Sequence, residues 1–268
     1  MTRHSHSKNP LYARFVQLRH INIKHVREMY LVFQAHYEHT DVDTFMSDLS
    51  MKDGAMLLIE RDTDRIVGFS TVVTMAINTT GATGGTGIFS GDTIIEPQYW
   101  GSRVLHIAFL KYIILQKLRR PFKPTFWLLI SKGYKTYLLM ANNFDRYYPH
   151  PDNRYPEMES LVRNYCDVLF PGYYDDTSNL LDFGESAQCL KSGIAGVTEE
   201  LARQESKIRF FQQCNPSWSR GTELPCIGLL SYTMLLKTFI KWTMQSSGRS
   251  LGKSLGKVGG RLKLLGAK

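Results

Sequence analysis

Residues 91–103 read GDTIIEPQYWGSR and join two different hydrophobic patterns. Up to Pro97 the segment is typical of a strand, whereas after Gly101 apolar residues recur at helical spacing until Pro121. A helix N-terminus offers unpaired backbone N–H groups and a partial positive charge, which suit a phosphate. A glycine lets the backbone approach such a group closely. The junction therefore predicts a site for a phosphate-bearing ligand at the start of the helix.

Patterns on both sides of the junction predict the element order β-α-α-β-β-β-α-β-α over residues 12–144. The expected strands lie at 12–20, on both sides of a polar turn at 62–65, at 88–97 and at 126–131. The expected helices lie at 23–39, 43–49, 102–120 and 136–144. The glycine- and threonine-rich segment 78–87 is expected to be a loop.

The element order and the junction resemble the GNAT superfamily of N-acyltransferases. In that family a strand of the form Leu-x-Val-x-Pro leads through Gln/Arg-x-x-Gly-x-Gly/Ala into a helix. The stretch GDTIIEPQYWGSRVLHIAFL keeps Gln98 and Gly101 of this pattern. The resemblance implies an α/β (α+β) fold, with a mixed, mostly antiparallel sheet flanked by helices and an α-rich C-terminal elaboration.

The resemblance also implies the acyl donor, which would be a thioester on coenzyme A or on a phosphopantetheinyl carrier protein. The implied donor-binding residues are Ile94, Ile95, Gln98, Gly101, Ser102 and Arg103. The two isoleucines would act through their backbone groups, as an added strand does. No metal is expected, because the histidines and cysteines show no ligand spacing.

Arg103 departs from the family pattern, which has a small residue at this position. In one interpretation Arg103 makes a charge-assisted contact with a phosphate. In a second, the donor is a carrier protein, whose single phosphate needs less of a cradle. In a third, the loop binds no donor and Arg103 is solvated on the first helical turn.

Acyl transfer to an amine needs a base for the amine and an acid for the leaving thiolate. By the resemblance, Asp92 on the strand before the junction is the candidate base, and Tyr137 or Tyr134 on the later helix is the candidate acid. Each has a structural alternative: Asp92 could cap a turn or pair with a cation, and each tyrosine could pack in the core. The stretch HYEHTDVD (36–43) could also hold a base or bind an ammonium group.

The sequence divides into four expected parts: a flexible N-terminus (1–11), a GNAT-like core (12–144), a C-terminal elaboration packed on it (145–236) and a basic, glycine-rich tail (237–268). The formal net charge is +9, and the tail holds eight Lys/Arg and no Asp/Glu, so residues 1–236 carry only +1. A nearly neutral body makes nucleic acid an unlikely partner.

Residues 246–268 place leucines and cations on separate helical lines, a pattern that suits an amphipathic helix on an anionic membrane; a solvated basic tail is the alternative. The apolar runs 104–115 and 227–236 are too short to span a bilayer and fit buried helices. With no signal-peptide pattern, the expected location is cytoplasmic, with peripheral association at the inner face of a membrane.

Two functions fit these observations. The first is an N-acyltransferase that transfers an acyl group, with a fatty acyl group as one candidate, from acyl-CoA or an acyl carrier protein to an amine. The second is a non-catalytic binding module that keeps the fold and uses its basic tail at membranes.

Overall fold

The computed structural model describes residues 10–38, 40–79, 84–184 and 205–237. The chain forms two compact units, 1–230 and 231–268, and all the elements below belong to the first. Of the second unit the description covers 231–237, where 232–237 are helical. Most of the basic tail, including the proposed membrane segment 246–268, lies outside the described residues.

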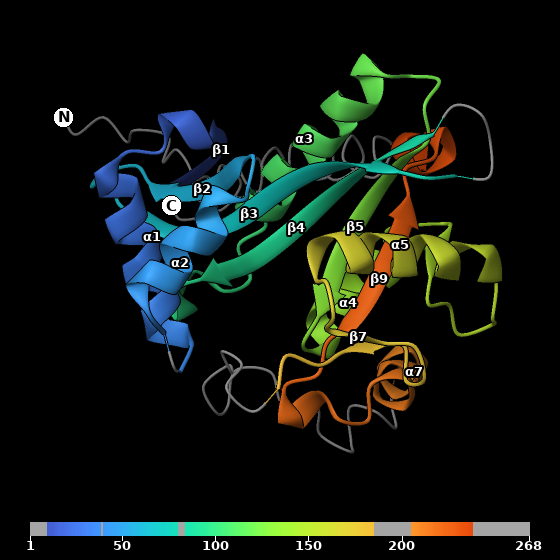
Figure 1. Cartoon of the computed structure of the whole chain (residues 1–268). Helices are drawn as coiled ribbons and strands as arrows, with labels where there is room; N and C mark the ends of the chain where they lie inside the picture. The colour runs from blue at the N-terminus through green and yellow to red at the C-terminus, as the bar shows by residue number, and fades with distance from the viewer. Residues whose placement is uncertain (1–9, 39, 80–83, 185–204, 238–268) are drawn as a thin grey trace, which may run out of the picture. The chain divides into compact units, whose positions relative to one another are not determined.

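The first unit is built on a seven-stranded sheet with the order β1-β2-β3-β4-β5-β9-β6 (Figure 1). Its strands are β1 (Leu11–Gln17), β2 (Gly54–Glu60), β3 (Ile66–Ile77), β4 (Gly85–Ile95), β5 (Thr125–Ser131), β9 (Leu224–Leu229) and β6 (Tyr147–Tyr148). Among the described strand pairs of this sheet, β4 and β5 are parallel and the others are antiparallel. A separate ribbon pairs β7 (Tyr174–Asp175) with β8 (Leu180–Leu181). The predicted mixed, mostly antiparallel sheet is confirmed.

Helices cover both faces of this sheet. They are α1 (Ile23–His36), α2 (Val42–Ser50), α3 (Val104–Arg119), α4 (Tyr134–Ala141), α5 (Glu159–Leu169) and α7 (Ser206–Cys214). Single 3-10 turns lie at η1 (Leu18–His20), η2 (Pro97–Tyr99), η3 (Pro156–Met158) and η4 (Trp218–Arg220). Phe33 of α1 and Phe45 of α2 pack on one face of β2 and β3, and Leu105 of α3 packs on the other. Val162 of α5 packs over β5 and β9.

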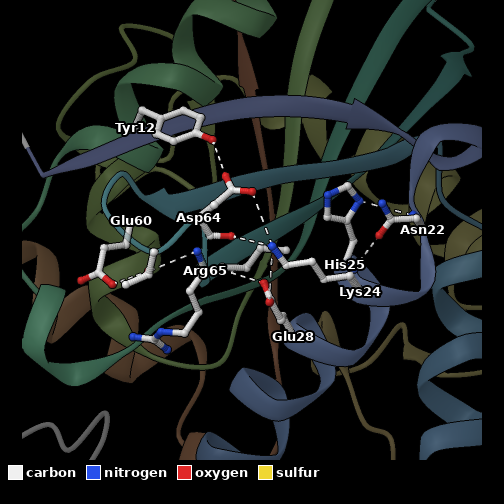
Figure 2. Close-up of polar contacts among 10 residues, drawn as sticks. Tyr12, Asn22, Lys24, His25, Glu28, Glu60, Asp64 and Arg65 are labelled. Carbon is white, nitrogen blue, oxygen red and sulfur yellow. Dashed lines mark hydrogen bonds and ion pairs between the residues drawn. The ribbon is translucent and has the colours of Figure 1, made fainter.

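A polar network fastens α1 to the turn between β2 and β3 (Figure 2). Asn22 caps the helix by accepting from the His25 N–H at 3.0 Å, and the His25 ring accepts from the Asn22 N–H at 3.3 Å. Lys24 donates to the Asp64 backbone oxygen at 3.1 Å, and Tyr12 donates to its carboxylate at 3.1 Å. Asp64 has φ of 52°, so the network holds the left-handed turn in place.

The sheet extends beyond the expected core of 12–144. Strand β9 pairs with β5 from Phe126↔Leu229 to Ser131↔Leu224, so residues of the expected elaboration complete the sheet. The prediction that 227–236 form a buried helix was wrong, because β9 runs to Leu229 and helix begins only at residue 232. Among the described residues, no helix is long and apolar enough to cross a membrane.

Candidate active site

Strands β4 and β5 separate at their C-terminal ends. Their parallel pairing runs from Thr86↔Thr125 to Ser90↔Leu129 and stops there, although β4 continues to Ile95 and β5 to Ser131. Figure 1 shows the two strands diverging from this point. Each strand leads into a helix, α3 after β4 and α4 after β5. The carboxyl ends of neighbouring parallel strands are where open α/β sheets bind ligands.

Beyond Ser90, β5 no longer pairs with β4. Some backbone N–H and C=O groups of the last β4 residues therefore face this open edge. The Glu96 N–H donates to the Val67 oxygen at 2.9 Å, so the antiparallel alternation makes Phe69↔Ile94 the next hydrogen-bonded pair. The backbone of Ile94 therefore faces β3, and that of Thr93 and Ile95 faces the other side. Of the two isoleucines expected to offer backbone groups to a donor, only Ile95 has them on the open edge. Its oxygen already accepts from Trp100 Nε1 at 2.7 Å.

Gly101 closes the turn between β4 and α3. Its φ is +84°, a conformation that L side chains rarely adopt, and a Cβ built there has no described heavy atom within 4 Å. The turn is braced on its other side: Glu96 pairs with the Arg65 guanidinium, and Gln98 Nε2 donates to Glu96 at 3.0 Å. The predicted site residue Gln98 thus has a structural partner within the turn.

Two cations, Arg103 and Lys135, lie near the N-terminus of α3. Exposed Arg103 is the N-cap residue, and the Ser102 hydroxyl lies 3.4 Å from the Val104 N–H. The Lys135 ammonium, on the first turn of α4, lies 5.7 Å from the centre of the Trp100 ring. Residues 97–144 hold eight Lys/Arg and no Asp/Glu. Two helix starts and two cations thus meet at this end of the sheet, an arrangement suited to an anion.

Asp92 lies where β4 and β5 part, two residues after the last β4–β5 pair. The β3–β4 register shifts between Ser70 and Val72, so Gly91 and Asp92 together oppose Thr71. A Cβ on Gly91 would lie 2.2 Å from the Thr71 hydroxyl, so glycine is needed at this bulge. The bulge re-aims the Asp92 side chain, which keeps some solvent contact but is surrounded by protein.

Burial raises the pKa of Asp92 to about 6, and the negative charge of Asp48 adds to the effect. The nearby Lys52 ammonium opposes this shift, Glu223 adds to it, and Lys132 opposes it. We call these five residues the carboxylate–lysine cluster: Asp48, Lys52, Asp92, Lys132 and Glu223. A carboxyl with a pKa of about 6 is ionised at neutral pH and still basic enough to accept a proton.

The second half of the cluster comes from the ends of β5 and β9. Lys132 follows β5 and Glu223 precedes β9, and their ammonium and carboxylate lie 3.2 Å apart. Burial raises the pKa of Glu223, while Lys132 lowers it. The Lys132 ammonium also lies 5.5 Å from the centre of the Tyr37 ring, and burial with the charges of Asp92 and Glu223 raises the pKa of Tyr37. Tyr37 therefore stays protonated beside the cluster.

Tyr137, one of the two candidate acids, lies in the core. It is fully buried against Phe211 of α7, and its hydroxyl donates to the Pro149 oxygen at 3.2 Å. Burial raises its pKa, with Tyr147 adding to the effect. A hydroxyl held inside the core has no route to a leaving thiolate, so the structure argues against Tyr137 as the acid. Tyr134, half-buried on the first turn of α4, remains the better candidate.

The stretch HYEHTDVD contributes to the site in an unexpected way. His36 is buried and its Nδ1 bonds the Val32 oxygen at 2.8 Å, while Asp41 caps α2 by accepting from the Thr44 N–H at 2.8 Å. Among the described residues of this stretch, Tyr37 is the one that reaches the cluster. In the described part of the chain, no three His, Cys, Asp or Glu side chains gather as metal ligands.

The order of the strands, the parallel β4–β5 pair that opens at its end and the helix after β4 define a GNAT-like fold. No protein-family profile and no curated protein sequence matches the chain.

Solved structures of acetyltransferases are similar to part of the chain. A Trypanosoma brucei acetyltransferase is 15% identical over 48% of this chain and 89% of its own length, with a TM-score of 0.33. The Escherichia coli GNAT family N-acetyltransferase YhbS, solved with CoA, is 8% identical over 53% and 72%, with a TM-score of 0.38. Arabidopsis thaliana NAA60, solved with acetyl-CoA, is 12% identical over 50% and 88%, with a TM-score of 0.38.

Proposed function

We propose that this chain is an N-acyltransferase that moves an acyl group from a thioester donor to an amine. The observation that carries the proposal is the placement of Asp92. It stands at the point where β4 and β5 part, on the strand that leads to the start of α3, and it belongs to a partly buried cluster of charged residues. Donor, acceptor and base would then meet at one place.

The donor side is supported by the open edge of β4 and the turn that follows it. A pantetheine arm would pair with the backbone of Thr93 and Ile95, as an added strand does. Its phosphate would lie at the start of α3, where Gly101 leaves room and Arg103 and Lys135 supply positive charge. This geometry supports the first interpretation of Arg103, as a phosphate contact.

The acceptor side is supported by the charge of the carboxylate–lysine cluster. When ionised, three carboxylates face two ammonium groups, which leaves one negative charge for an incoming cation. An amine arrives as an ammonium ion and must lose a proton before it can attack. Asp92 accepts that proton, the amine nitrogen bonds the thioester carbonyl carbon, and the C–S bond then breaks.

The leaving thiolate takes a proton from an acid, for which we propose Tyr134, and the nitrogen of the new amide gives its second proton to the Tyr134 phenolate. Tyr134 lies on the first turn of α4, next to Lys135. The Lys135 ammonium lies near the ring of Trp100, which belongs to the turn between β4 and α3. A helix N-terminus stabilises the phenolate that forms when the proton leaves. The nearby Tyr37 keeps its own proton and lines the cluster.

A more specific donor and a more specific acyl group can be proposed. We propose acyl-CoA as donor, because two cations at the turn exceed what the single phosphate of a carrier protein needs; an acyl carrier protein is the second candidate. We also propose a fatty acyl group, since eight of the 40 residues from 145 to 184 are Phe or Tyr. The protein would act in the cytoplasm, bound peripherally at the inner face of a membrane.

The alternative function is a non-catalytic binding module with a membrane-associating tail. One observation favours it: the Ile95 oxygen is taken by Trp100, so the open edge offers one acceptor fewer to a pantetheine arm. In that case the chain would bind a thioester or CoA without releasing thiol.

Thiol release separates the two functions. The full-length protein is incubated with acetyl-CoA, a long-chain acyl-CoA or an acyl carrier protein, with a panel of amines, and free thiol is measured. Intact-protein mass spectrometry under native conditions identifies any thioester that co-purifies. Release that depends on the amine and is lost in Asp92→Asn supports the enzyme. Donor binding without release in any combination supports the binding module.

A further inference from the structure

The C-terminal end of α3 exposes an unusual combination of side chains. Lys111, Leu115 and Leu118 follow each other at i, i+4 and i+7, so they lie along one line of the helix. Phe122, in the turn after the helix, continues the spacing. Phe122 is 96% exposed, Leu118 58% and Leu115 47%. Large apolar side chains gathered in this way on a surface mark a site of interaction.

The turn that carries Phe122 is held firmly. The buried Lys117 ammonium donates to the Pro121 oxygen at 2.9 Å and to the Lys123 oxygen at 2.8 Å. The Lys123 N–H also donates to the Arg120 oxygen at 3.1 Å. The oxygens on both sides of Phe122 are thus bonded to one lysine, which fixes the direction in which the phenyl ring leaves the protein. Figure 1 shows this end of α3 standing out from the sheet.

Positive charge surrounds the exposed apolar side chains. Lys111, Arg119, Arg120 and Lys123 are all exposed, and residues 104–123 contain no Asp or Glu. One carboxylate from outside this segment lies nearby: Asp53 adds to the effect of burial in raising the pKa of Tyr112, which is next to Lys111. The Asp53 carboxylate accepts a hydrogen bond from the Thr74 N–H at 2.7 Å. The α3 tip, which we define as Lys111, Leu115, Leu118, Arg119, Arg120, Phe122 and Lys123, is therefore apolar and cationic together.

We propose that the α3 tip docks this protein on an anionic lipid bilayer, with Phe122 and Leu118 inserted between headgroups and the cations on lipid phosphates. An interfacial site needs both kinds of contact, apolar side chains at the acyl boundary and cations at anionic headgroups. A second copy of the chain is a poorer occupant, since a two-fold contact would set four cations against the same four. Nucleic acid offers phosphates and bases on which a phenyl ring can stack, but no apolar partner for the two leucines.

Vesicle binding by the full-length chain tests this surface. Vesicles of phosphatidylcholine with phosphatidylglycerol, or of phosphatidylcholine alone, are sedimented with wild type and variants. Phe122→Ser should lower the partition coefficient on anionic vesicles at least about tenfold, because it removes most of a buried phenyl group. Replacing Arg119, Arg120 and Lys123 with glutamine should lower it about fivefold per cation. Ile23→Ser is the matched control, since Ile23 is 88% exposed on α1, and should change binding less than about twofold.

A second readout reports insertion itself, even if another part of the chain also tethers the protein. The tryptophan difference spectrum of Phe122→Trp against wild type should shift to the blue on anionic vesicles and be quenched by brominated lipids, whereas that of Ile23→Trp should not. Unquenched Trp at position 122 in the bound protein would overturn the proposal, as would equal binding of wild type and Phe122→Ser. Dimerisation that Phe122→Ser abolishes, without vesicle binding by wild type, would assign the tip to a second copy.

Discussion

At the scale of single residues, Asp92 connects the structure to the chemistry. Its pKa of about 6 has two main causes, burial and the charge of Asp48, and both follow from the bulge that turns the side chain towards the cluster. Perturbed carboxyls of this kind concentrate at functional sites. The shift has consequences for activity and for stability, and the two can be measured separately.

Activity should depend on the ionised form of Asp92. Turnover of wild type should rise as the pH passes through about 6 and level off above it. Asp92→Asn cannot accept a proton, and we expect turnover to fall roughly 100-fold or more, with the acidic limb lost and donor affinity kept. The measurement is a pH–rate profile of thiol release, and an unchanged limb in Asp92→Asn would assign it to another group.

The stability of the fold should depend on pH in the opposite direction from activity, because the fold is more stable when Asp92 is protonated. The unfolded chain ionises Asp92 near pH 3.8 and the folded chain near 6, so the folded state loses stability as the pH rises through this interval. Asp92→Asn carries no charge at any pH, so it should be more stable than wild type at pH 8, by about 1–3 kcal/mol, and not at pH 4. Urea unfolding at both pH values tests this, and a variant equally or less stable at pH 8 would contradict a buried carboxylate.

The two lysines of the cluster should tune the same pKa. Both lower the pKa of Asp92, and Lys52 has the larger effect. Lys52→Met and Lys132→Met should therefore move the midpoint of the acidic limb to higher pH, and Lys52→Met should move it further. Lys24→Met, which removes an exposed lysine outside the cluster, is the control. A midpoint that stays in place in both cluster variants would separate these lysines from Asp92.

At the scale of elements, the turn between β4 and α3 should separate donor binding from folding. Gly101→Val should destabilise the fold by about 1–2 kcal/mol, because φ is +84°. It should also block the donor phosphate, since the new side chain enters space that the protein leaves open. Gly172→Val is a matched control, with φ of +82° and an equally open Cβ position. Calorimetric titration with acyl-CoA should show weaker binding for Gly101→Val alone.

Arg103→Ala should lower donor affinity about tenfold without changing stability, if Arg103 contacts a phosphate. The same titration at low and high salt checks the charge dependence, because screening weakens an exposed contact. If wild type and Arg103→Ala bind the donor with the same affinity at both salt concentrations, Arg103 does not contact a phosphate and is a solvated residue of the first helical turn.

Strand β9 should be essential to the sheet. A Cβ on Gly228 would lie 2.7 Å from the Phe144 ring, so Gly228→Ala should destabilise the protein by about 1–3 kcal/mol. Phe144→Leu should relieve part of the collision, and the double variant should lose less than the sum of the two single losses. Additive losses in urea unfolding would mean that the ring and the glycine do not meet.

The sequence predicted the elements whose signals are local. The hairpin around 62–65, the helix after Gly101 and the strand that ends before Pro97 each follow from periodicity or a turn residue. Strand β9 was missed because it pairs with β5 about a hundred residues earlier, and the segment TELPCIGLL has no alternation that would reveal it.

The site was predictable to the same extent. Asp92 and Gly101 stand beside the junction, so a motif could find them. Lys132 and Glu223 meet only because β5 and β9 are neighbours, and nothing in either local sequence indicates that contact. The burial of Tyr137 against α7 was not predictable either, because it depends on a helix that the sequence did not reveal.

At the scale of the whole molecule, charge is distributed unevenly. Acids and lysines are paired in the cluster, whereas residues 103–123, from the turn before α3 to the α3 tip, carry six Lys/Arg and no Asp/Glu. A chain whose first 236 residues carry only +1 thus presents a strongly cationic region along α3. Such a region attracts anions over a Debye length, about 10 Å at 0.1 M salt.

The proposed function requires a thioester donor to bind where β4 and β5 part. Hydrogen–deuterium exchange of the full-length protein, with and without acetyl-CoA or a long-chain acyl-CoA, tests it most directly, because it reports location as well as binding. We expect slower exchange at the amides of Thr93 and Ile95 and on the first turn of α3, and less protection there in Gly101→Val. Donor-induced protection confined to other segments, or none at saturating donor, would contradict it.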